Sequence, residues 1–208
     1  MQQWGRPQRL RMDNGLPWGT NSKLPSALGL WLVGLGVELI YGRPARSTDN
    51  AVVERGQGVL ANWTEPAECP TALDYEAQLA WAAHTQRERY RLADGRTRLQ
   101  AFPALLDNAR PYDPQQDAQL WSLDRVRRYL SGFHFQRKVE RNGRITLFAN
   151  NYSVGRRYAR QYVEIHLDLL TDEWVMCDEY GTELRRHPVK ELSYELIRQL
   201  KLAKRRKN

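Results

Sequence analysis

Two short stretches near the start of the chain restrict its fold most. Leu10–Gly15 alternates apolar and polar residues before it ends in Asp-Asn-Gly, which is typical of a strand that stops at a tight turn, because Asn and Gly accept positive φ. Asn50–Arg55 contains no proline and follows a Thr-Asp pair that can cap a helix. The sequence therefore predicts that Asp13 lies at a strand tip and that Glu54 lies on a helix.

A strand-tip aspartate and a helix-borne glutamate can converge on a metal ion. Magnesium prefers oxygen ligands, keeps several of its waters and is usually held by only one or two protein carboxylates. The alternative is that Asp13 only opens a turn and that Glu54 is a solvated helix residue. The residues that flank the two acids favour the metal site.

The chain resembles the C-terminal part of a bacterial DDE transposase, of the retroviral-integrase-like superfamily. In that family the second catalytic Asp opens an Asp-Asn-Gly turn, as at Asp13, and the catalytic Glu lies in an Asn-Ala-x-Val-Glu-Arg helix, as at Glu54. A Pro-containing loop, here 42–46, precedes that helix. The resemblance implies that Asp13 and Glu54 are catalytic and bind metal, and that the residues beside them support the motif: Asn14, Gly15, Asn50 and Arg55.

The chain departs from this family at two points. Members often have fewer residues between the two acids, and a strict count from Asp13 reaches Asp49. We choose Glu54, because the motif fixes the helix face and a loop lengthens at little entropic cost. The family also needs a third carboxylate on an earlier strand, and residues 1–12 contain neither Asp nor Glu. We therefore expect a truncated enzyme that lacks the first part of its catalytic domain and is inactive alone.

Composition narrows the class of protein. The chain has 208 residues, of which 41% are hydrophobic and 27% charged, an ordinary globular composition rather than a disordered one. No apolar run reaches the roughly 18 residues of a membrane helix, and the N-terminus carries no export signal. Cys69 and Cys177 lie far apart without metal-type spacing. We expect a cytoplasmic protein with no membrane partner.

The net charge of +8 is placed unevenly along the chain. Residues 1–120 carry 13 Lys and Arg against 13 Asp and Glu, whereas residues 121–208 carry 19 against 11. All of the excess therefore lies in the last part of the chain, which predicts a polyanionic partner there. A surplus that serves only solubility is the alternative.

The pattern of elements predicts an α/β part followed by an all-β part. Residues 1–63 read as strand, helix, strand, loop and helix, the order that the resemblance implies for the second half of a ribonuclease-H-like core. Residues 64–107 are expected to be a helical extension, and 108–120, rich in Pro, Asp and Gln, a linker. A DNA-binding β-barrel is expected over 121–188 and a basic helix or tail over 189–208.

Five β-rich runs between 133 and 187 suggest a small closed barrel, since closure removes exposed sheet edges. Asn142-Gly143 is a strong hairpin signal between the first two runs. The resemblance extends here, because the C-terminal domain of such transposases is a small SH3-like barrel. Its Arg-x-Val-x-x-Asn-Gly-x-Ile pattern matches Arg137–Ile145, and its Tyr-x-Val-Gly pattern matches Tyr152–Gly155.

Four basic groups are candidates for contact with DNA, and for each the alternative is a solvated surface or helix end. One lies on the predicted hairpin and one in the loop that follows it. The third lies at the C-terminus and the fourth at the end of the second long helix. In that order they are Arg137, Lys138, Arg141 and Arg144; Arg156, Arg157 and Arg160; Lys204, Arg205 and Arg206; and Arg87, Arg89 and Arg91.

The function that the resemblance implies is metal-dependent phosphoryl transfer on DNA, in integration or transposition. Three carboxylates of the intact enzyme would hold two Mg²⁺ or Mn²⁺ ions, one to activate a water or a 3′-hydroxyl and one to stabilise the leaving oxygen. Relatives act as multimers on paired DNA ends, so a homo-oligomer on DNA is expected. The alternative is a non-catalytic, DNA-binding remnant of a transposase.

Overall fold

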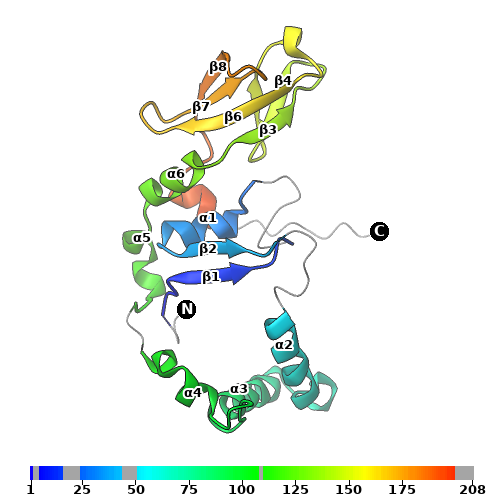
Figure 1. Ribbon diagram of the computed structural model, residues 1–208, viewed down its shortest axis with the longest axis vertical. Coiled ribbons are helices and arrows are strands. Elements are labelled where there is room, and N and C mark those ends of the chain that lie inside the picture. Colours follow the sequence, from blue (N-terminus) through cyan, green and yellow to red (C-terminus); the bar gives the residue numbers. More distant parts are fainter. Residues whose placement is uncertain (2–4, 16–23, 44–50, 108–109, 200–208) are drawn as a thin grey trace. The chain divides into compact units, whose positions relative to one another are not determined.

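The computed structural model describes residues 1, 5–15, 24–43, 51–107 and 110–199, and its contacts divide the chain into two compact units (Figure 1). The helical unit consists of Met1–Gly5 and Gly42–Pro111. The C-terminal unit consists of Arg6–Tyr41 together with the chain from Tyr112 onward. Each unit is described by itself.

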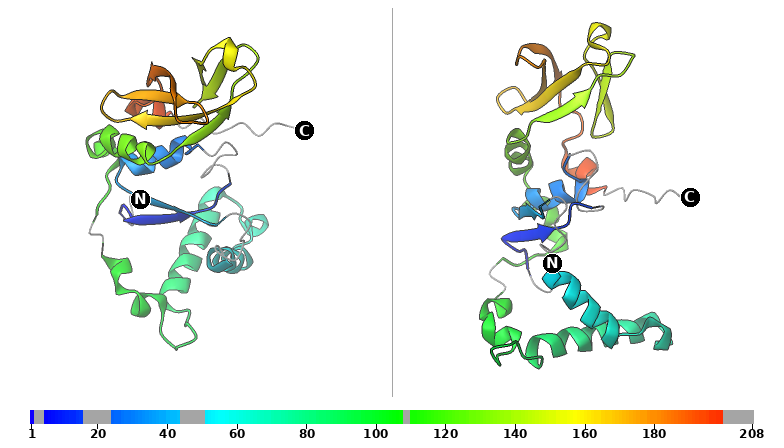
Figure 2. Two further views of the ribbon diagram at one scale, coloured as in Figure 1. Left: turned by 45° about the horizontal axis from the view of Figure 1, so that its top comes forward. Right: turned by 45° about the vertical axis from the view of Figure 1, so that its right-hand side comes forward.

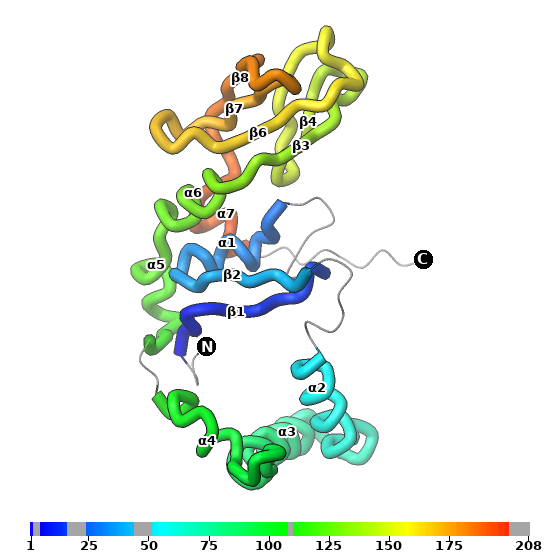
Figure 3. Tube along the Cα trace, viewed as in Figure 1, coloured from blue at the N-terminus to red at the C-terminus, as the bar shows by residue number. Residues whose placement is uncertain are grey.

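The helical unit is built from two long helices and several short turns, which Figure 3 follows along the chain. Thr71 starts the second long helix with a capping box: its hydroxyl accepts from the Asp74 amide at 3.2 Å, and the Asp74 carboxylate accepts from the Thr71 amide at 3.0 Å. The elements are α2 (Ala51–Trp63), η2 (Pro66–Glu68), α3 (Ala72–Glu88), α4 (Arg98–Ala101) and η3 (Pro103–Leu106).

Helix α2 runs without a break through Gly56 and Gly58, although each glycine weakens a helix interior. A Cβ placed on either glycine meets no described atom within 4 Å, so no close neighbour accounts for them. We expect Gly58→Ala to raise the free energy of unfolding by about 1 kcal/mol, because alanine loses less backbone entropy on folding. Urea denaturation measures the change, and a loss of stability would reveal a contact that requires glycine.

The C-terminal unit begins with a strand, helix and strand, as the sequence predicted. β1 (Arg9–Met12) and β2 (Glu38–Tyr41) pair in parallel, with Arg9 opposite Glu38 and Met12 opposite Tyr41. Between them, α1 (Ala27–Gly34) starts at Ser26, whose hydroxyl accepts from the Gly29 amide at 3.0 Å. Most of the helix is buried, from Gly29 to Gly34 except Trp31, as its apolar composition requires. This two-stranded sheet agrees with an α/β fold, and its identity as part of a ribonuclease-H-like core stays a prediction.

Helix α1 packs against helices that are far away in the sequence. The Gly34 carbonyl accepts from the Ser122 amide and from the Arg125 guanidinium, both at 2.9 Å. Figures 1 and 3 show α1 beside α6 and α7. The partners are α6 (Leu123–Ser131) and α7 (Tyr194–Arg198), and α5 (Asp117–Leu120) contacts the helix through a hydrogen bond from Trp31 to Asp117; the 3-10 turn η4 (Pro114–Gln116) precedes α5. The predicted domain boundaries stay predictions, and of the predicted basic helix only the part up to 199 lies within the described residues.

The remaining strands form two antiparallel sheets, which agrees with the predicted β-rich region. One sheet has four strands in the order β3-β6-β7-β8, and the other is the hairpin of β4 and β5. In chain order the strands are β3 (Phe135–Lys138), β4 (Arg144–Leu147), β5 (Asn150–Ser153), β6 (Tyr162–Asp168), β7 (Glu173–Cys177) and β8 (Glu183–Pro188), with the 3-10 turn η5 (Arg156–Tyr158) after β5.

The expected closed barrel is wrong for the described strands, since β3 and β8 are the two open edges of the larger sheet. The expected pairing of β3 with β4 is wrong too: β3 pairs with β6, and β4 pairs with β5. The reason is a two-residue turn at Phe148 and Ala149, whose φ values are 46° and 64°. Such a turn normally needs Gly or Asn, so the sequence gives no signal of it.

Aromatic packing offsets the strain of this turn. The Phe148 ring stacks on Trp174 at 6.0 Å and meets Phe135 edge-on at 6.5 Å. The hairpin is also tied to the sheet by Glu191, a buried carboxylate that accepts hydrogen bonds from Trp174 Nε1 at 2.9 Å and from the Tyr152 hydroxyl. Burial raises the pKa of Glu191. These contacts fix the position of the β4–β5 hairpin, which the site described below uses.

Candidate nucleic-acid interface

Asp13 directly follows β1, so the predicted position at a strand tip is confirmed. The side chain is exposed, and its Oδ1 accepts from the Asn14 amide at 2.7 Å. Oδ2 lies 3.0 Å from the place of a Cβ at Gly15, so the turn passes close to the carboxylate. The turn chemistry is thus as predicted, and the catalytic role of Asp13 stays a prediction.

Glu54 lies in the first turn of α2, and its side chain is exposed, as is that of Arg55. Asn50 lies outside the described residues. Because Glu54 belongs to the helical unit and Asp13 to the C-terminal unit, their predicted convergence stays a prediction. No group of three His, Cys, Asp or Glu side chains placed to hold a metal ion is present within the described residues.

The structure does bring two of the predicted basic groups together. The Gly143 carbonyl accepts from the amides of Val154 at 2.8 Å and Gly155 at 3.0 Å, which joins the turn before β4 to the loop after β5. Figure 2 shows this turn and η5 at the same end of the sheet. We call the exposed arginines of these two segments the basic loop cluster: Arg141, Arg144, Arg156, Arg157 and Arg160.

The close approach of the two segments depends on Gly143. A Cβ at this position would lie 2.5 Å from the Arg156 amide nitrogen and 2.6 Å from the Gly155 carbonyl carbon, and the φ of Gly143 is +80°. Backbone at this distance cannot move aside as a flexible side chain can. Gly143 therefore serves two purposes, the turn itself and the contact that gathers the arginines.

The arginines of this cluster differ from Arg127 and Arg186 in their charge contacts. Within the described chain none of its five arginines forms an ion pair. By contrast, Arg127 pairs with Asp172, and Arg186 donates to Asp168 at 2.7 Å. Because no acid neutralises them there, the arginines of the cluster keep their donors for an external anion.

Two aromatic rings lie under cations beside the cluster. The Arg157 guanidinium lies 4.7 Å from the centroid of Tyr158, and Lys138 Nζ lies 5.8 Å from the centroid of Tyr162. Such contacts hold a cation in place without neutralising it. Lys138 and Tyr162 face each other across β3 and β6, so the basic surface extends onto the sheet.

Arg137 differs from its predicted partners. It lies on the same side of β3 as the buried Phe135, is half-buried itself, and donates to the Gln136 carbonyl at 2.8 Å. Burial lowers the pKa of Arg137. This arginine is therefore less available to phosphate than Lys138, and the two-residue period of the strand is the signal that separates them.

The predicted basic residues of the helical unit end α3. Arg87 lies in the last turn, Arg89 follows as the C-cap, and Arg91 donates to the Gly95 carbonyl at 2.6 Å. Tyr90 lies between Arg89 and Arg91, and its ring lies 5.9 Å from that of Trp63, a contact that the sequence alone does not indicate. Lys204, Arg205 and Arg206 lie outside the described residues.

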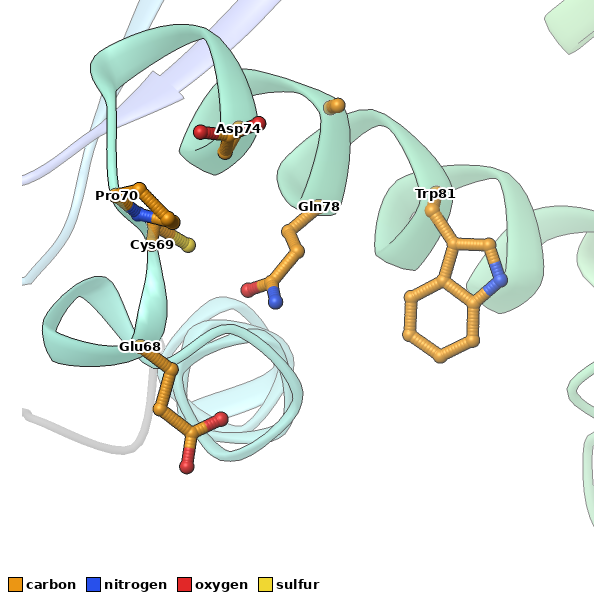
Figure 4. Close-up of a pocket in the computed structure, with 7 residues that line it drawn as sticks. Glu68, Cys69, Pro70, Asp74, Gln78 and Trp81 are labelled. Carbon is orange, nitrogen blue, oxygen red and sulfur yellow. The ribbon is translucent and has the colours of Figure 1, made fainter.

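A separate pocket lies between η2 and α3 and is lined by Glu68, Cys69, Pro70, Asp74, Ala77, Gln78 and Trp81 (Figure 4). Its carboxylates do not suit a phosphate. Burial and the charges of Asp74, Glu68 and Glu65 raise the pKa of the Cys69 thiol, so this cysteine stays protonated rather than nucleophilic. We assign the pocket no role in binding DNA.

One family comparison bears on this site. Residues 123–197 match the family model described as Mu transposase, C-terminal domain. The match supports a relationship of this segment to a transposase family. It runs from α6 to α7, includes the whole basic loop cluster, and does not include Asp13 or Glu54. Among the described residues, no helix is both long and apolar enough to cross a membrane.

Proposed function

We propose that the C-terminal unit binds DNA through the basic loop cluster, as part of a transposase or integrase. The observation that carries this proposal is the contact between Gly143 and the backbone at Gly155 and Arg156, which gathers five arginines free of ion pairs within the described chain. The family match over 123–197 supports the same function for the same segment.

The chemistry of the cluster fits phosphate rather than bases. Arginine presents several donors in a fixed fork that matches a phosphate, and exposed loops can follow a backbone. Contacts of this kind position a protein on DNA and carry little sequence information. We therefore expect strong dependence on salt and only modest preference among DNA sequences.

The decisive measurement is the affinity of the full chain for duplex DNA as salt increases. Replacing Arg156, Arg157 and Arg160 by Ala should reduce the slope of log affinity against log salt by about three units if all three meet phosphates. The matched control replaces Arg128, Arg185 and Arg198, three exposed arginines of the same unit, and should change the slope much less. Binding that is indifferent to salt, or equally weakened by both triple variants, would contradict the proposal.

We further propose that Asp13 and Glu54 contribute carboxylates to a Mg²⁺ or Mn²⁺ site in the assembled transposase, as the resemblance to DDE transposases implies. Carboxylate oxygens are the donors such ions prefer, and both side chains are exposed. When bound, two such ions activate the attacking oxygen and stabilise the leaving oxygen in phosphoryl transfer. The resemblance also implies a homo-oligomer on DNA.

One assay distinguishes a catalytic protein from one that only binds DNA. DNA nicking in Mg²⁺ or Mn²⁺ that Glu54→Gln abolishes and Glu65→Gln preserves would assign catalysis to this chain. Glu65 is a suitable control because it is an exposed acid of the same unit. Salt-dependent binding without nicking would favour the second candidate, a non-catalytic DNA-binding protein.

A further inference from the structure

The helical unit carries a cluster of aromatic rings that the function proposed above does not use. Trp63, at the end of α2, has its ring centroid 6.2 Å from that of Trp81 and 5.9 Å from that of Tyr90. Trp81 is 55% exposed and Tyr90 is 48% exposed. Trp63 lies between the other two rings in this row and is half-buried, so the exposed surface of the row is formed mainly by Trp81 and Tyr90. A contiguous exposed aromatic surface is typical of a binding site for a ligand or partner.

Arginines adjoin this row at one end. The Arg98 guanidinium lies 5.7 Å from the Tyr90 ring centroid, and its position is fixed by a 2.7 Å hydrogen bond to the Gln86 carbonyl. Arg91 pairs with Thr97 in an isolated antiparallel β-bridge, and Arg98 follows Thr97 in the chain, so Arg91 and Arg98 lie near each other. Within the described residues, Arg89, Arg91 and Arg98 form no ion pair, whereas Arg96 pairs with Asp94 at 2.7 Å.

The other end of the row is acidic. Trp81 lines the pocket that also holds Glu68 and Asp74, and Figure 4 shows Trp81 and Gln78 projecting from α3 on the same side. The acidic end therefore disfavours phosphate groups, and the arginine end favours them. A ligand that combines flat apolar rings with phosphates matches this arrangement.

We propose that Trp81, Trp63 and Tyr90 form a stacking platform for unpaired DNA bases, with the adjoining phosphates held by Arg89, Arg91 and Arg98. Every base has a flat face that stacks on an exposed indole or phenol ring, so binding is expected to tolerate different sequences. The platform lies in another unit than the basic loop cluster and uses stacking rather than phosphate contacts alone. The test of this proposal is therefore independent of whether the basic loop cluster binds duplex DNA.

The experiment measures the affinity of the full chain for two single strands of equal length. One is oligothymidine, and the other is an abasic strand with the same number of phosphates. Stacking of one base is expected to make oligothymidine bind about 5- to 150-fold more tightly, because each stacked base contributes about 1–3 kcal/mol. Trp81→Ala should remove most of this preference, and Trp81→Phe, which keeps a flat ring, should retain much of it. Circular dichroism verifies that the variants fold.

Two controls isolate the platform. Tyr180→Ala removes an aromatic ring of the other unit that is 84% exposed, and should leave the preference unchanged. The triple replacement of Arg156, Arg157 and Arg160 should weaken both strands alike. Equal affinity for the two strands in the unmodified chain would overturn the proposal. So would a Trp81→Ala variant that keeps the preference and instead changes the sedimentation of the protein, which would make the rings a protein-contact surface.

Discussion

Gly34→Ala is expected to destabilise the C-terminal unit by about 3 kcal/mol or more, one of the largest effects of a single methyl group in this chain. A Cβ at Gly34 would lie 1.9 Å from Trp121 Nε1 and 2.3 Å from Cε2. The ring cannot move aside easily, because it is buried and meets Tyr194 at 5.4 Å. The helix cannot shift either, since the Gly34 carbonyl accepts hydrogen bonds from Ser122 and Arg125.

Urea denaturation of the full chain measures this loss, with Gly58→Ala as the control in which the added methyl group meets open space. The double variant Gly34→Ala, Trp121→Leu should recover part of the stability, because the smaller side chain gives the methyl group room. If Gly34→Ala unfolds at the same urea concentration as the unmodified chain, then α1 does not press on the Trp121 ring.

The contact between Gly34 and Trp121 is an example of a structural feature that could not be predicted from the sequence. Local signals were sufficient for β1, its turn at Asp13 and the buried helix α1, because each depends on neighbouring residues. Nothing local indicates that α1 packs against α5, α6 and α7, which follow after the whole helical unit. Contacts of this range depend on the complementary shapes of two surfaces, and hydrophobic periodicity does not encode them.

The β-rich region shows a second kind of limit. Asn142-Gly143 correctly predicted a turn, and the inference that its flanking strands pair was wrong because a competing turn at Phe148 and Ala149 pairs β4 with β5. That turn is stabilised by the packing of Phe148 on Trp174, a tertiary contact. Tertiary packing thus overrode the local preference for Gly or Asn at positive φ.

The sequence predicted which residues belong to the candidate DNA site but not how they are arranged in space. The sequence indicated arginines on the turn and on the following loop, and the fold adds the backbone contact at Gly143 that joins them. The alternation of buried and exposed residues along β3 could have excluded Arg137. The stacking row is harder to foresee, because Trp63 at the end of α2 meets Trp81 in α3 and Tyr90 just after it only through the packing of α2 on α3.

Asp117→Ala is the second replacement with a large expected effect, a loss of about 3 kcal/mol in the C-terminal unit. The Asp117 carboxylate is 3% exposed and accepts from the Tyr112 hydroxyl at 2.8 Å, the Tyr194 hydroxyl at 3.0 Å and Trp31 Nε1 at 3.2 Å. It therefore links α1 and α7 to the segment before α5. Removal leaves three polar groups without their acceptor, and each unpaired buried donor costs about 1–3 kcal/mol, less where water can reach it.

Asp113→Ala is the matched control, because Asp113 lies on the same segment and only caps η4 through a 2.9 Å bond from the Gln115 amide. The loss of such a cap is expected to cost about 1 kcal/mol. Equal stability of the Asp113 and Asp117 variants in urea would contradict a central role for the Asp117 carboxylate.

The same group of residues predicts how stability depends on alkaline pH. Burial, followed by the hydrogen bond to Asp117 and its charge, raises the pKa of Tyr112 to about 12 from its ordinary value of 10.0. An acid whose pKa is higher in the folded state favours folding while it is protonated, so its contribution is complete below pH 10 and is lost as pH rises through about 12. Tyr112→Phe should flatten the decline of stability in that range, and a decline of unchanged steepness would assign it to other groups, among them Tyr194, whose pKa is raised by burial and by the same carboxylate.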